Sequence, residues 1–185
     1  MAFWTKKSED AATPPVANDP GAASMTPEGR EKAVAQSKKI LAAFGEITSV
    51  LMRSPNHKHH SIADLEWLVV PAVTTGQFSV AGGHAKSNGL LVPMAVVFWA
   101  SVSEDVDKRL SASLKDPIKL QPNEWKSGDI LWLVDAVGDP KFTRALVKKL
   151  AEREWGGKSV RFKGRDKDGA VKIGSFGASG EILAD

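Results

Sequence analysis

Two long apolar runs constrain the fold of this chain more than any other feature. Residues 90–100 are apolar throughout and include valine, phenylalanine and tryptophan, which are residue types that favour strands. The run predicts a buried central strand, and Pro93 stands near its start, where a proline damages a sheet least. Residues 130–137 form a second apolar run and predict another buried strand.

Helix signals surround these strands. Thr26 followed by Pro27 is a typical helix start, and Pro55 disfavours helical geometry just before it, so a helix is expected over about residues 27–53. Apolar residues recur along it at spacings of three and four, which predicts one buried stripe. The stripe consists of Ile40, Phe44, Ile47 and Leu51. The other expected elements are a short helix at about 64–69 opened by a capping box, strands at 77–81, 160–163 and 171–176, and helices at about 103–114 and 139–155.

Strands and helices mix here without regular β-α-β alternation. This pattern predicts an α+β fold with a largely antiparallel central sheet flanked by helices. Gly82-Gly83 and Asn88-Gly89 are predicted to be turn material. Residues 1–25, rich in Ala, Pro, Asp and Ser from residue 8 on, are expected to be a disordered N-terminal tail, and 26–185 a single domain.

The composition excludes several classes of function. The chain has no cysteine, so disulfides, thiolate nucleophiles and cysteine-ligated metals are ruled out. The net charge is only +3, and without an arginine-rich run it does not favour nucleic-acid binding. No apolar run approaches the roughly 18 residues of a membrane span, and the start lacks a secretory signal. We therefore expect a cytoplasmic protein with no stable membrane insertion.

His57 and Asp135 form the most informative pair of polar residues. His57 follows the end of the first helix, and Asp135 ends the apolar part of the second buried strand. A histidine oriented by a carboxylate can remove a proton near neutral pH, provided that the fold brings the two together. The alternatives are a solvated loop histidine and a carboxylate that caps the next turn. A zinc site built from His57, His59 and His60 is a weaker interpretation because no carboxylate or cysteine stands at ligand spacing.

The tryptophans and basic residues near these segments can have structural roles as well as functional ones. Trp125 and Trp132 are expected to fill the core or flank a cleft, and Gly128 is expected to supply an unusual dihedral to a turn. Basic residues gather in two stretches, which are solvated helix faces or a docking surface for an acidic protein. The stretches contain Lys38, Lys39, Arg53 and Lys58, and Arg144, Lys148, Lys149 and Arg153.

Taken in order, several short segments resemble the toxin-activating lysine acyltransferases, the hemolysin-activating proteins encoded beside RTX toxins. The matching segments are residues 54–57, 70–72, 76–78, 93–95, 98–101 with Glu104, 124–129 continuing through Trp132 to Asp135, 161–163 and 174–176. The chain departs from the family at Lys58 and His60, where an arginine and a tryptophan are common, and in the turn after Asp135, which looks shorter. These departures leave the acyl-chain length and the acceptor open.

The resemblance implies a fold like that of the GNAT acetyltransferases and an activity. The family transfers a fatty acyl group from acyl-acyl carrier protein to internal lysines of an RTX protoxin and needs no separate cofactor. His57 matches the family's essential histidine and Asp135 its essential aspartate. No glycine-rich pyrophosphate loop precedes a helix, which agrees with a carrier-protein donor rather than coenzyme A.

Several finer expectations follow from the same resemblance. The matching segments, together with Lys58 next to the first of them, supply the residues expected to contact substrate, namely Ser54, Asn56, Lys58, Trp99, Trp125 and Trp132. His57 is expected to act as a general base, with an acyl-imidazole nucleophile as the alternative. The sequence does not decide whether the protein forms a homodimer. It also leaves two alternative functions, namely an acyltransferase with a different acceptor, such as an adhesin, and a binding module without catalysis.

Overall fold

The structure is a computed structural model that describes residues 26–85, 87–165, 167–177 and 181–183. The predicted tail, residues 1–25, lies outside the described residues. The chain divides into a part that ends at Ser37 and a part that begins at Lys38. In the first part, helix α1 (Pro27–Arg53) begins at the predicted residue, because the Thr26 hydroxyl accepts a hydrogen bond from the Gly29 amide at 3.2 Å.

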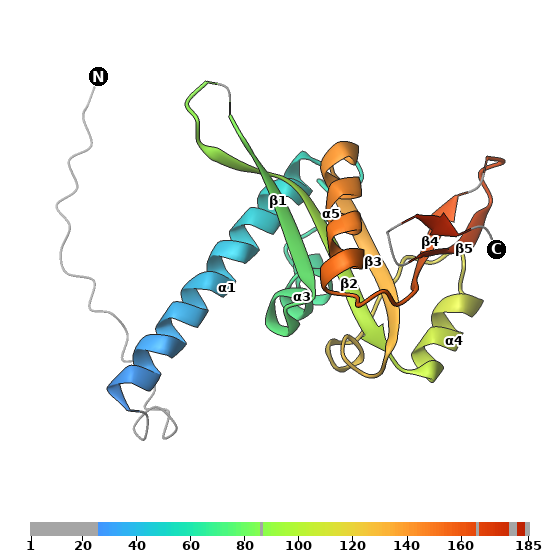
Figure 1. Ribbon diagram of the computed structural model, residues 1–185, viewed down its shortest axis with the longest axis horizontal. Coiled ribbons are helices and arrows are strands. Elements are labelled where there is room, and N and C mark those ends of the chain that lie inside the picture. The colour runs from blue at the N-terminus through green and yellow to red at the C-terminus, as the bar shows by residue number, and fades with distance from the viewer. Residues whose placement is uncertain (1–25, 86, 166, 178–180, 184–185) are drawn as a thin grey trace, which may run out of the picture. The chain divides into compact units, whose positions relative to one another are not determined.

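The strands of the second part form one sheet in the order β1-β2-β3-β4-β5-β6 across the described residues (Figure 1). Only β3 and β4 pair in parallel, and the other neighbours are antiparallel. The strands are β1 (Phe78–His84), β2 (Leu91–Val102), β3 (Ile130–Gly138), β4 (Val160–Arg165), β5 (Val171–Phe176) and β6 (Ile182–Leu183). The predicted α+β class with a largely antiparallel sheet is confirmed.

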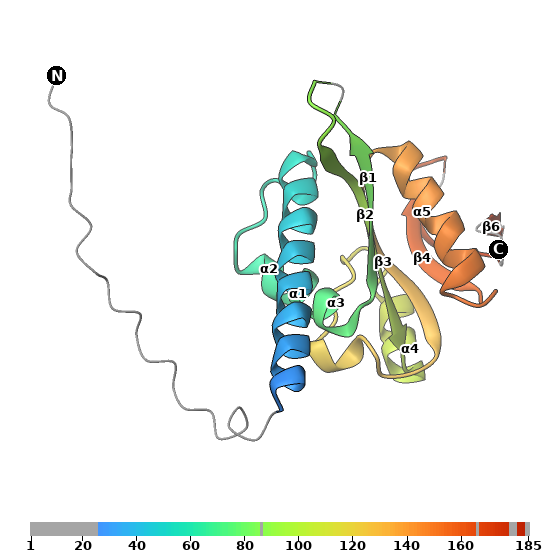
Figure 2. The ribbon, with the colours of Figure 1, turned by 60° about the vertical axis from the view of Figure 1, so that its left-hand side comes forward.

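Helices cover both faces of this sheet. Figure 2 shows α5 on one face and α2 and α3 on the other. The helices after α1 are α2 (Asp64–Leu68), α3 (Val70–Thr75), α4 (Glu104–Ala112) and α5 (Pro140–Arg153). One core cluster joins the end of α1, α2, α3 and α4 to the sheet, and a second lies under α5. The predicted stripe of α1 is confirmed, since its four residues all pack in the first cluster.

The helix caps follow the sequence signals. Ser103 and Asp139 both have extended backbone and accept amide hydrogen bonds, Ser103 from Val106 and Asp139 from Lys141. These contacts start α4 and α5 close to the expected positions. Helix α3 is not predicted by the sequence, because its segment carries two valines and two threonines and lacks helix periodicity.

Two predictions about glycines were wrong. Gly82 and Gly83 are not turn residues but lie within β1, where a Cβ on Gly83 would come within 3.2 Å of Met94 on β2. Their small size therefore lets neighbouring groups approach the strand closely. Gly128 has no positive φ, yet a Cβ there would meet the carbonyl oxygen of Val102 at 2.6 Å. The reason for this glycine is close packing and not backbone conformation.

The parallel pair β3–β4 is short. Only two residue pairs are in register, Leu131 with Val160 and Trp132 with Arg161. Beyond Trp132, β3 continues to Gly138 and β4 to Arg165 without pairing to each other. The sheet is therefore split beyond this point, and the split positions the site described below.

The close approach at Gly128 predicts a stability effect. Replacing Gly128 with alanine forces the added methyl group against backbone atoms of Val102 and Ser103, so the free energy of unfolding should fall by about 1–3 kcal/mol. A methyl group added to Gly45, in the middle of α1, would have no atom within 4 Å, so Gly45→Ala should stabilise the protein by about 0.5–1 kcal/mol. Urea unfolding measures the change in free energy of unfolding for both variants. Equal changes in the two variants would contradict the prediction.

Candidate active site

His57 is held by a tight turn at the end of α1. The carbonyl oxygen of Ser54 accepts hydrogen bonds from the amides of His57, at 3.1 Å, and Lys58, at 2.9 Å. The Arg53 guanidinium donates to the carbonyl oxygen of Pro93 on β2, which ties the helix end to the sheet. Because Pro55 cannot continue the helix, the chain turns here and the imidazole points toward β3.

A β-bulge in β3 decides which face of the sheet Asp135 occupies. The pairing of β2 with β3 leaves Val134 without an opposite residue. In a regular strand Asp135 would share a face with Leu133, which packs under α5. The extra residue resets this alternation, so that Val134 packs in the core cluster on the other face and Asp135 reaches His57 on that same side.

His57 and Asp135 form the expected pair. The Nε2 atom of His57 lies 2.8 Å from Oδ2 of Asp135, and the Nδ1 atom lies 2.9 Å from the hydroxyl of Ser54. The second carboxylate oxygen of Asp135 accepts from the amide of Ala136 at 2.8 Å. The His57 side chain is 14% exposed and the Asp135 side chain 31%, so both remain within reach of a ligand.

These contacts assign the roles of the two ring nitrogens. An ionised carboxylate can only accept hydrogen bonds, so Nε2 carries the proton that it shares with Asp135. Nδ1 then has a free lone pair, which accepts from the Ser54 hydroxyl. The atom of His57 that can take up a further proton is therefore Nδ1, with Asp135 placed to stabilise the charged ring.

The pair lines a cleft of about 570 Å³, which we call the histidine cleft. It lies at the split between β3 and β4 and is lined by His57, Asp135 and residues of β4. Its apolar walls include Trp67, Leu68, Val134, Phe162 and Val171, and its cationic groups are Lys115, Lys163 and Arg165. A cleft of this kind can hold an apolar chain beside a proton acceptor.

Lys163 closes one wall of the histidine cleft. Its ammonium group donates to the carbonyl oxygens of Ser113, at 2.7 Å, and Asp116, at 3.1 Å. Burial lowers the pKa of Lys163, and the carboxylate of Asp116 opposes that shift. The two bonds fasten the loop after α4 to β4 and so shape the cleft.

His60 stands beside His57 in the same cleft. The two rings are 5.3 Å apart and meet edge to face, and the His60 ring also meets Trp67 at 6.2 Å. The Nδ1 atom of His60 is buried and has no hydrogen-bond partner among the described residues.

The turn after His60 is held by the predicted capping box. Asp64 accepts from the hydroxyl and the amide of Ser61, both at 2.8 Å, and from the indole of Trp67 at 3.2 Å. The side-chain and backbone hydrogen bonds from Ser61, followed by that from Trp67, lower the pKa of Asp64 to about 2. The carboxylate form of Asp64 therefore holds Trp67, a wall of the histidine cleft, in place.

The other predicted site residues lie elsewhere. Trp99, Trp125 and Trp132 are only 8%, 1% and 0% exposed and belong to the core clusters, outside the histidine cleft. Asn56 and Lys58 are exposed in the turn around His57 and do not line the cleft. Substrate contact by these five residues, and by Ser54, stays a prediction.

Trp132 stabilises the fold through a buried hydrogen bond. Its indole donates to buried Asp107 at 2.8 Å, and the guanidinium of Arg161 contacts both oxygens of Asp107 at 2.7 Å. The network joins α4, β3 and β4 at the last paired position of the parallel strands, where the split begins. A buried carboxylate needs such partners to remain charged.

Sequence reasoning does not find several residues of the cleft. The sequence indicates His60 as part of a histidine cluster and as a departure from the family, and Phe162 and Lys163 as part of a strand that matches the family, but it assigns none of them to the cleft. Trp67 and Lys115 carry no signal that distinguishes a cleft wall from a core or surface position. No group of three or more metal-binding side chains comes together among the described residues, and none of the described helices is long and apolar enough to cross a membrane.

Fold and site together define the class of this protein. The α+β architecture is GNAT-like, and at the split of its parallel strands it holds a histidine paired with a carboxylate. A family model described as the RTX toxin acyltransferase family matches residues 36–174, well over half of the chain. The chain belongs to this family.

Named relatives agree with this assignment. The chain is 31% identical over 109 residues to a leukotoxin-activating lysine-acyltransferase, LktC, of Pasteurella haemolytica-like sp. (strain 5943B), covering 59% of this chain and 61% of that protein. It is 30% identical over 127 residues to the serotype A1 LktC of Mannheimia haemolytica, covering 68% and 71%. The protein-lysine palmitoyltransferase CyaC of Bordetella bronchiseptica is 30% identical over 131 residues, covering 70% and 66%. The chain thus spans about three fifths of the length of the Pasteurella relative.

The hydrogen bonds of Asp64 predict an acid-sensitive contribution to stability. The folded-state pKa of about 2 lies below the ordinary value of 3.8, so the unfolded chain takes up a proton first as the pH falls. The stabilisation is therefore complete at neutral pH and is lost as the pH falls toward 2. The difference in free energy of unfolding between wild type and Asp64→Asn should shrink over that range.

Urea unfolding at several pH values measures this difference. Ser61→Ala removes the hydroxyl donor and should reduce the same pH dependence, and the double variant should add little. A wild-type-to-variant difference that stays constant down to pH 2 would contradict the assignment.

Proposed function

We propose that this protein is a protein-lysine fatty acyltransferase, which takes an acyl group from acyl-acyl carrier protein and forms an amide on internal lysines of an RTX protoxin. The observation that carries the proposal is the 2.8 Å contact between His57 and Asp135 inside a partly apolar cleft. Family membership supports the reaction class, and the names of the relatives supply the acceptor group, a lysine.

The chemistry requires a base. A free lysine has a pKa of about 10.4 and is protonated at neutral pH, so it must lose protons in order to attack a thioester. In the proposed mechanism the ammonium group first loses one proton to solvent. Nδ1 of His57 then accepts a second proton as the lysine nitrogen bonds to the carbonyl carbon, and Asp135 stabilises the charged imidazole through Nε2. The carbon–sulfur bond then breaks, and the imidazolium returns the proton to the leaving thiolate.

Ser54 stands between Nδ1 and the substrate in this mechanism. Its hydroxyl is 2.9 Å from Nδ1, so it can pass a proton from the lysine to His57 or rotate away to admit the amine. Either role agrees with the expectation from the sequence that Ser54 contacts substrate. The alternative in which Nδ1 attacks the thioester itself forms an acyl-imidazole, and the same lone pair would serve.

The start of α5 supports a carrier-protein donor rather than coenzyme A. Coenzyme A presents a diphosphate, which many proteins bind with free amides at a helix N-terminus. Here Pro140 has no amide hydrogen, and Asp139 accepts from the amide of Lys141 at 2.7 Å. The carboxylate of Asp139 also repels an anion at this position. The helix start is thus unsuited to a diphosphate.

Loss of the base should abolish the activity. His57→Ala should lower the rate of lysine acylation by about 10²–10⁴-fold while the protein still folds, because the side chain is at the surface of a cleft and not in a core cluster. The measurement is the intact mass of the protoxin after incubation with acyl-acyl carrier protein, with thermal unfolding as the check on folding. Complete modification by this variant would remove His57 from the mechanism.

Asp135→Asn should also lower the rate, by about 10²–10⁴-fold, because an amide no longer stabilises the imidazolium by charge. Asp129→Asn, at the exposed residue just before β3, is the matched control and should retain activity. Intact mass of the enzyme mixed with donor alone distinguishes the two mechanisms. A general base leaves the enzyme mass unchanged, whereas a nucleophilic His57 adds one acyl group.

The acceptor is tested separately. Peptide mass mapping after parallel reactions with a protoxin and an adhesin identifies which protein gains acyl-lysine. A wild-type protein that binds carrier protein but never changes the mass of any acceptor would indicate a binding module and refute the proposed enzyme.

A further inference from the structure

His60 lines the histidine cleft beside His57, and the proposed mechanism does not use it. Its amide donates to the carbonyl oxygen of His57 at 2.9 Å, so one backbone turn joins the two histidines. The His60 ring meets the rings of His57 and Trp67 edge to face, and Trp67 is held by Asp64. The two imidazoles are therefore fixed with their centroids 5.3 Å apart, which is close enough for both to act on one reacting group.

The two ring nitrogens of His60 have different surroundings. Nδ1 is buried and has no hydrogen-bond partner among the described residues. Nε2 has no partner in that part of the chain either, but it is not buried, so a molecule in the cleft can reach it. A neutral imidazole has one N–H donor and one acceptor. Because a buried N–H without a partner is rarer and more costly than an unpaired acceptor, the proton belongs on Nε2.

The proposed acyl transfer needs a hydrogen-bond donor at the thioester oxygen. When the lysine nitrogen attacks, this oxygen gains negative charge, and an N–H group aimed at it stabilises the transition state. Three backbone amides around the catalytic pair are already engaged. Those of His57 and Lys58 donate to the carbonyl oxygen of Ser54, and that of Ala136 donates to the Asp135 carboxylate. None of these three amides is free to bind the oxygen.

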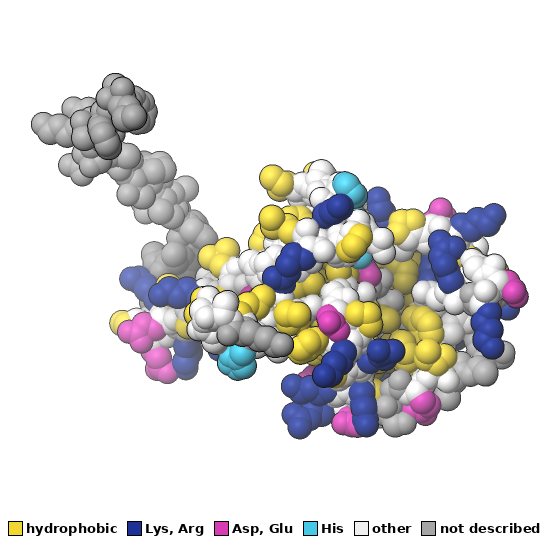
Figure 3. Space-filling model, turned by 90° about the horizontal axis from the view of Figure 1, so that it is seen from above, with side chains coloured by type: hydrophobic (Ala, Val, Ile, Leu, Met, Phe, Trp, Pro, Cys, Tyr) yellow, Lys and Arg dark blue, Asp and Glu magenta, His cyan; other side chains and the backbone are white. Residues whose placement is uncertain are grey.

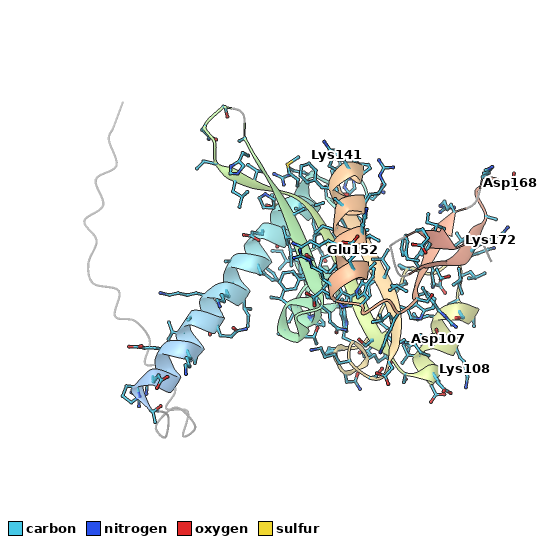
Figure 4. All side chains as sticks on the ribbon, viewed as in Figure 1. Asp107, Lys108, Lys141, Glu152, Asp168 and Lys172 are labelled. Atoms are coloured by element: carbon cyan, nitrogen blue, oxygen red, sulfur yellow. The ribbon has the colours of Figure 1, made fainter. Side chains whose placement is uncertain are left out.

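The cationic side chains of the cleft are less suited to this task. Lys163 donates to two backbone carbonyl oxygens, and Arg165 donates to the carbonyl oxygen of Gly169 at 3.1 Å. Figure 4 shows the turn after β4, marked by Asp168, well away from β2 and β3. Lys115 is exposed, and Figure 3 shows Lys and Arg side chains standing at the surface beside an apolar area on the face seen from above. Water screens an exposed cation, so it stabilises a developing charge less than an enclosed donor does.

We propose that His60 is a second catalytic residue, whose Nε2–H group donates a hydrogen bond to the carbonyl oxygen of the thioester. This inference rests on the proposed function. As the lysine nitrogen bonds to the carbonyl carbon, Nδ1 of His57 takes the proton and the π electrons of the carbonyl group move onto the oxygen. When the carbon–sulfur bond breaks, the double bond forms again, and the proton on Nε2 of His60 stays in place. A neutral imidazole acts as a donor of this kind in other enzymes.

Three substitutions at His60 separate the roles of its two ring nitrogens. The amide nitrogen of glutamine can occupy about the position of Nε2, and that of asparagine the position of Nδ1, whereas phenylalanine keeps a ring without a donor. His60→Phe and His60→Asn should lower kcat for lysine acylation by about 10²–10³-fold with little change in KM, because the hydrogen bond strengthens in the transition state. His60→Gln should keep at least about a tenth of the wild-type kcat, because it retains the donor.

His59 provides the matched control. It is exposed and does not line the histidine cleft, so His59→Phe should keep the wild-type kcat. Thermal unfolding of every variant checks that the fold is retained. If His60→Phe fails to fold, the comparison of glutamine with asparagine still tests the assignment, because these two variants differ in where the amide nitrogen lies. Equal kcat values for His60→Gln and His60→Asn would overturn it.

A donor with sulfur in place of the carbonyl oxygen distinguishes hydrogen bonding from positioning. Sulfur is a weak acceptor, so a dithioester of acyl carrier protein gains little from the Nε2–H group. Wild type and His60→Phe should transfer from the dithioester at rates within about threefold of each other, in contrast to the large gap with the ordinary thioester. Equal losses with both donors would mean that His60 only positions His57 and would refute the oxyanion role.

Failure of this inference differs from failure of the proposed function. If the wild-type protein transfers no acyl group from either donor to any lysine, the proposed function fails. An active wild type whose His60→Phe variant folds and has the same kcat leaves the proposed function intact and refutes the role of His60 alone.

Discussion

The antiparallel pairing of β2 with β3 is the constraint on which the rest of the structure depends. Both core clusters pack on these two strands, and the bulge at Val134 lies within their ladder. That single unmatched residue turns Asp135 away from the α5 face and toward His57. Without it, the carboxylate and the imidazole would lie on opposite faces of a buried sheet, and no side-chain motion could join them.

A second constraint acts on the other edge of β3. Asp107 accepts from Trp132 and Arg161 where β3 and β4 last pair, and beyond that point the strands separate. The network replaces backbone pairing with buried side-chain bonds at the place where the sheet opens. Cavities border the split on both faces of the sheet, and the one that contains His57 and Asp135 is the histidine cleft.

Charged side chains are arranged differently on the two faces of the sheet. The histidine cleft contains a histidine–carboxylate pair and a lysine bound to backbone carbonyls, so its charges are largely engaged within the protein. The cations of α5 have no such partners among the described residues. Engaged groups suit proton transfer, because proton transfer needs fixed geometry.

The sequence by itself determined the class of fold, both ends of α1, the starts of α4 and α5 and the two central strands, because proline, capping residues and apolar runs act locally. It also offered His57 and Asp135 as a candidate pair. It did not determine that Asp135 faces His57, since a bulge depends on how two strands pair and a regular alternation predicts the opposite face. It also left open whether each tryptophan fills the core or flanks a cleft, because bulk alone does not tell a core residue such as Trp125 from a cleft wall such as Trp67. Only the tertiary structure decided these points, because they depend on contacts between residues distant in the chain.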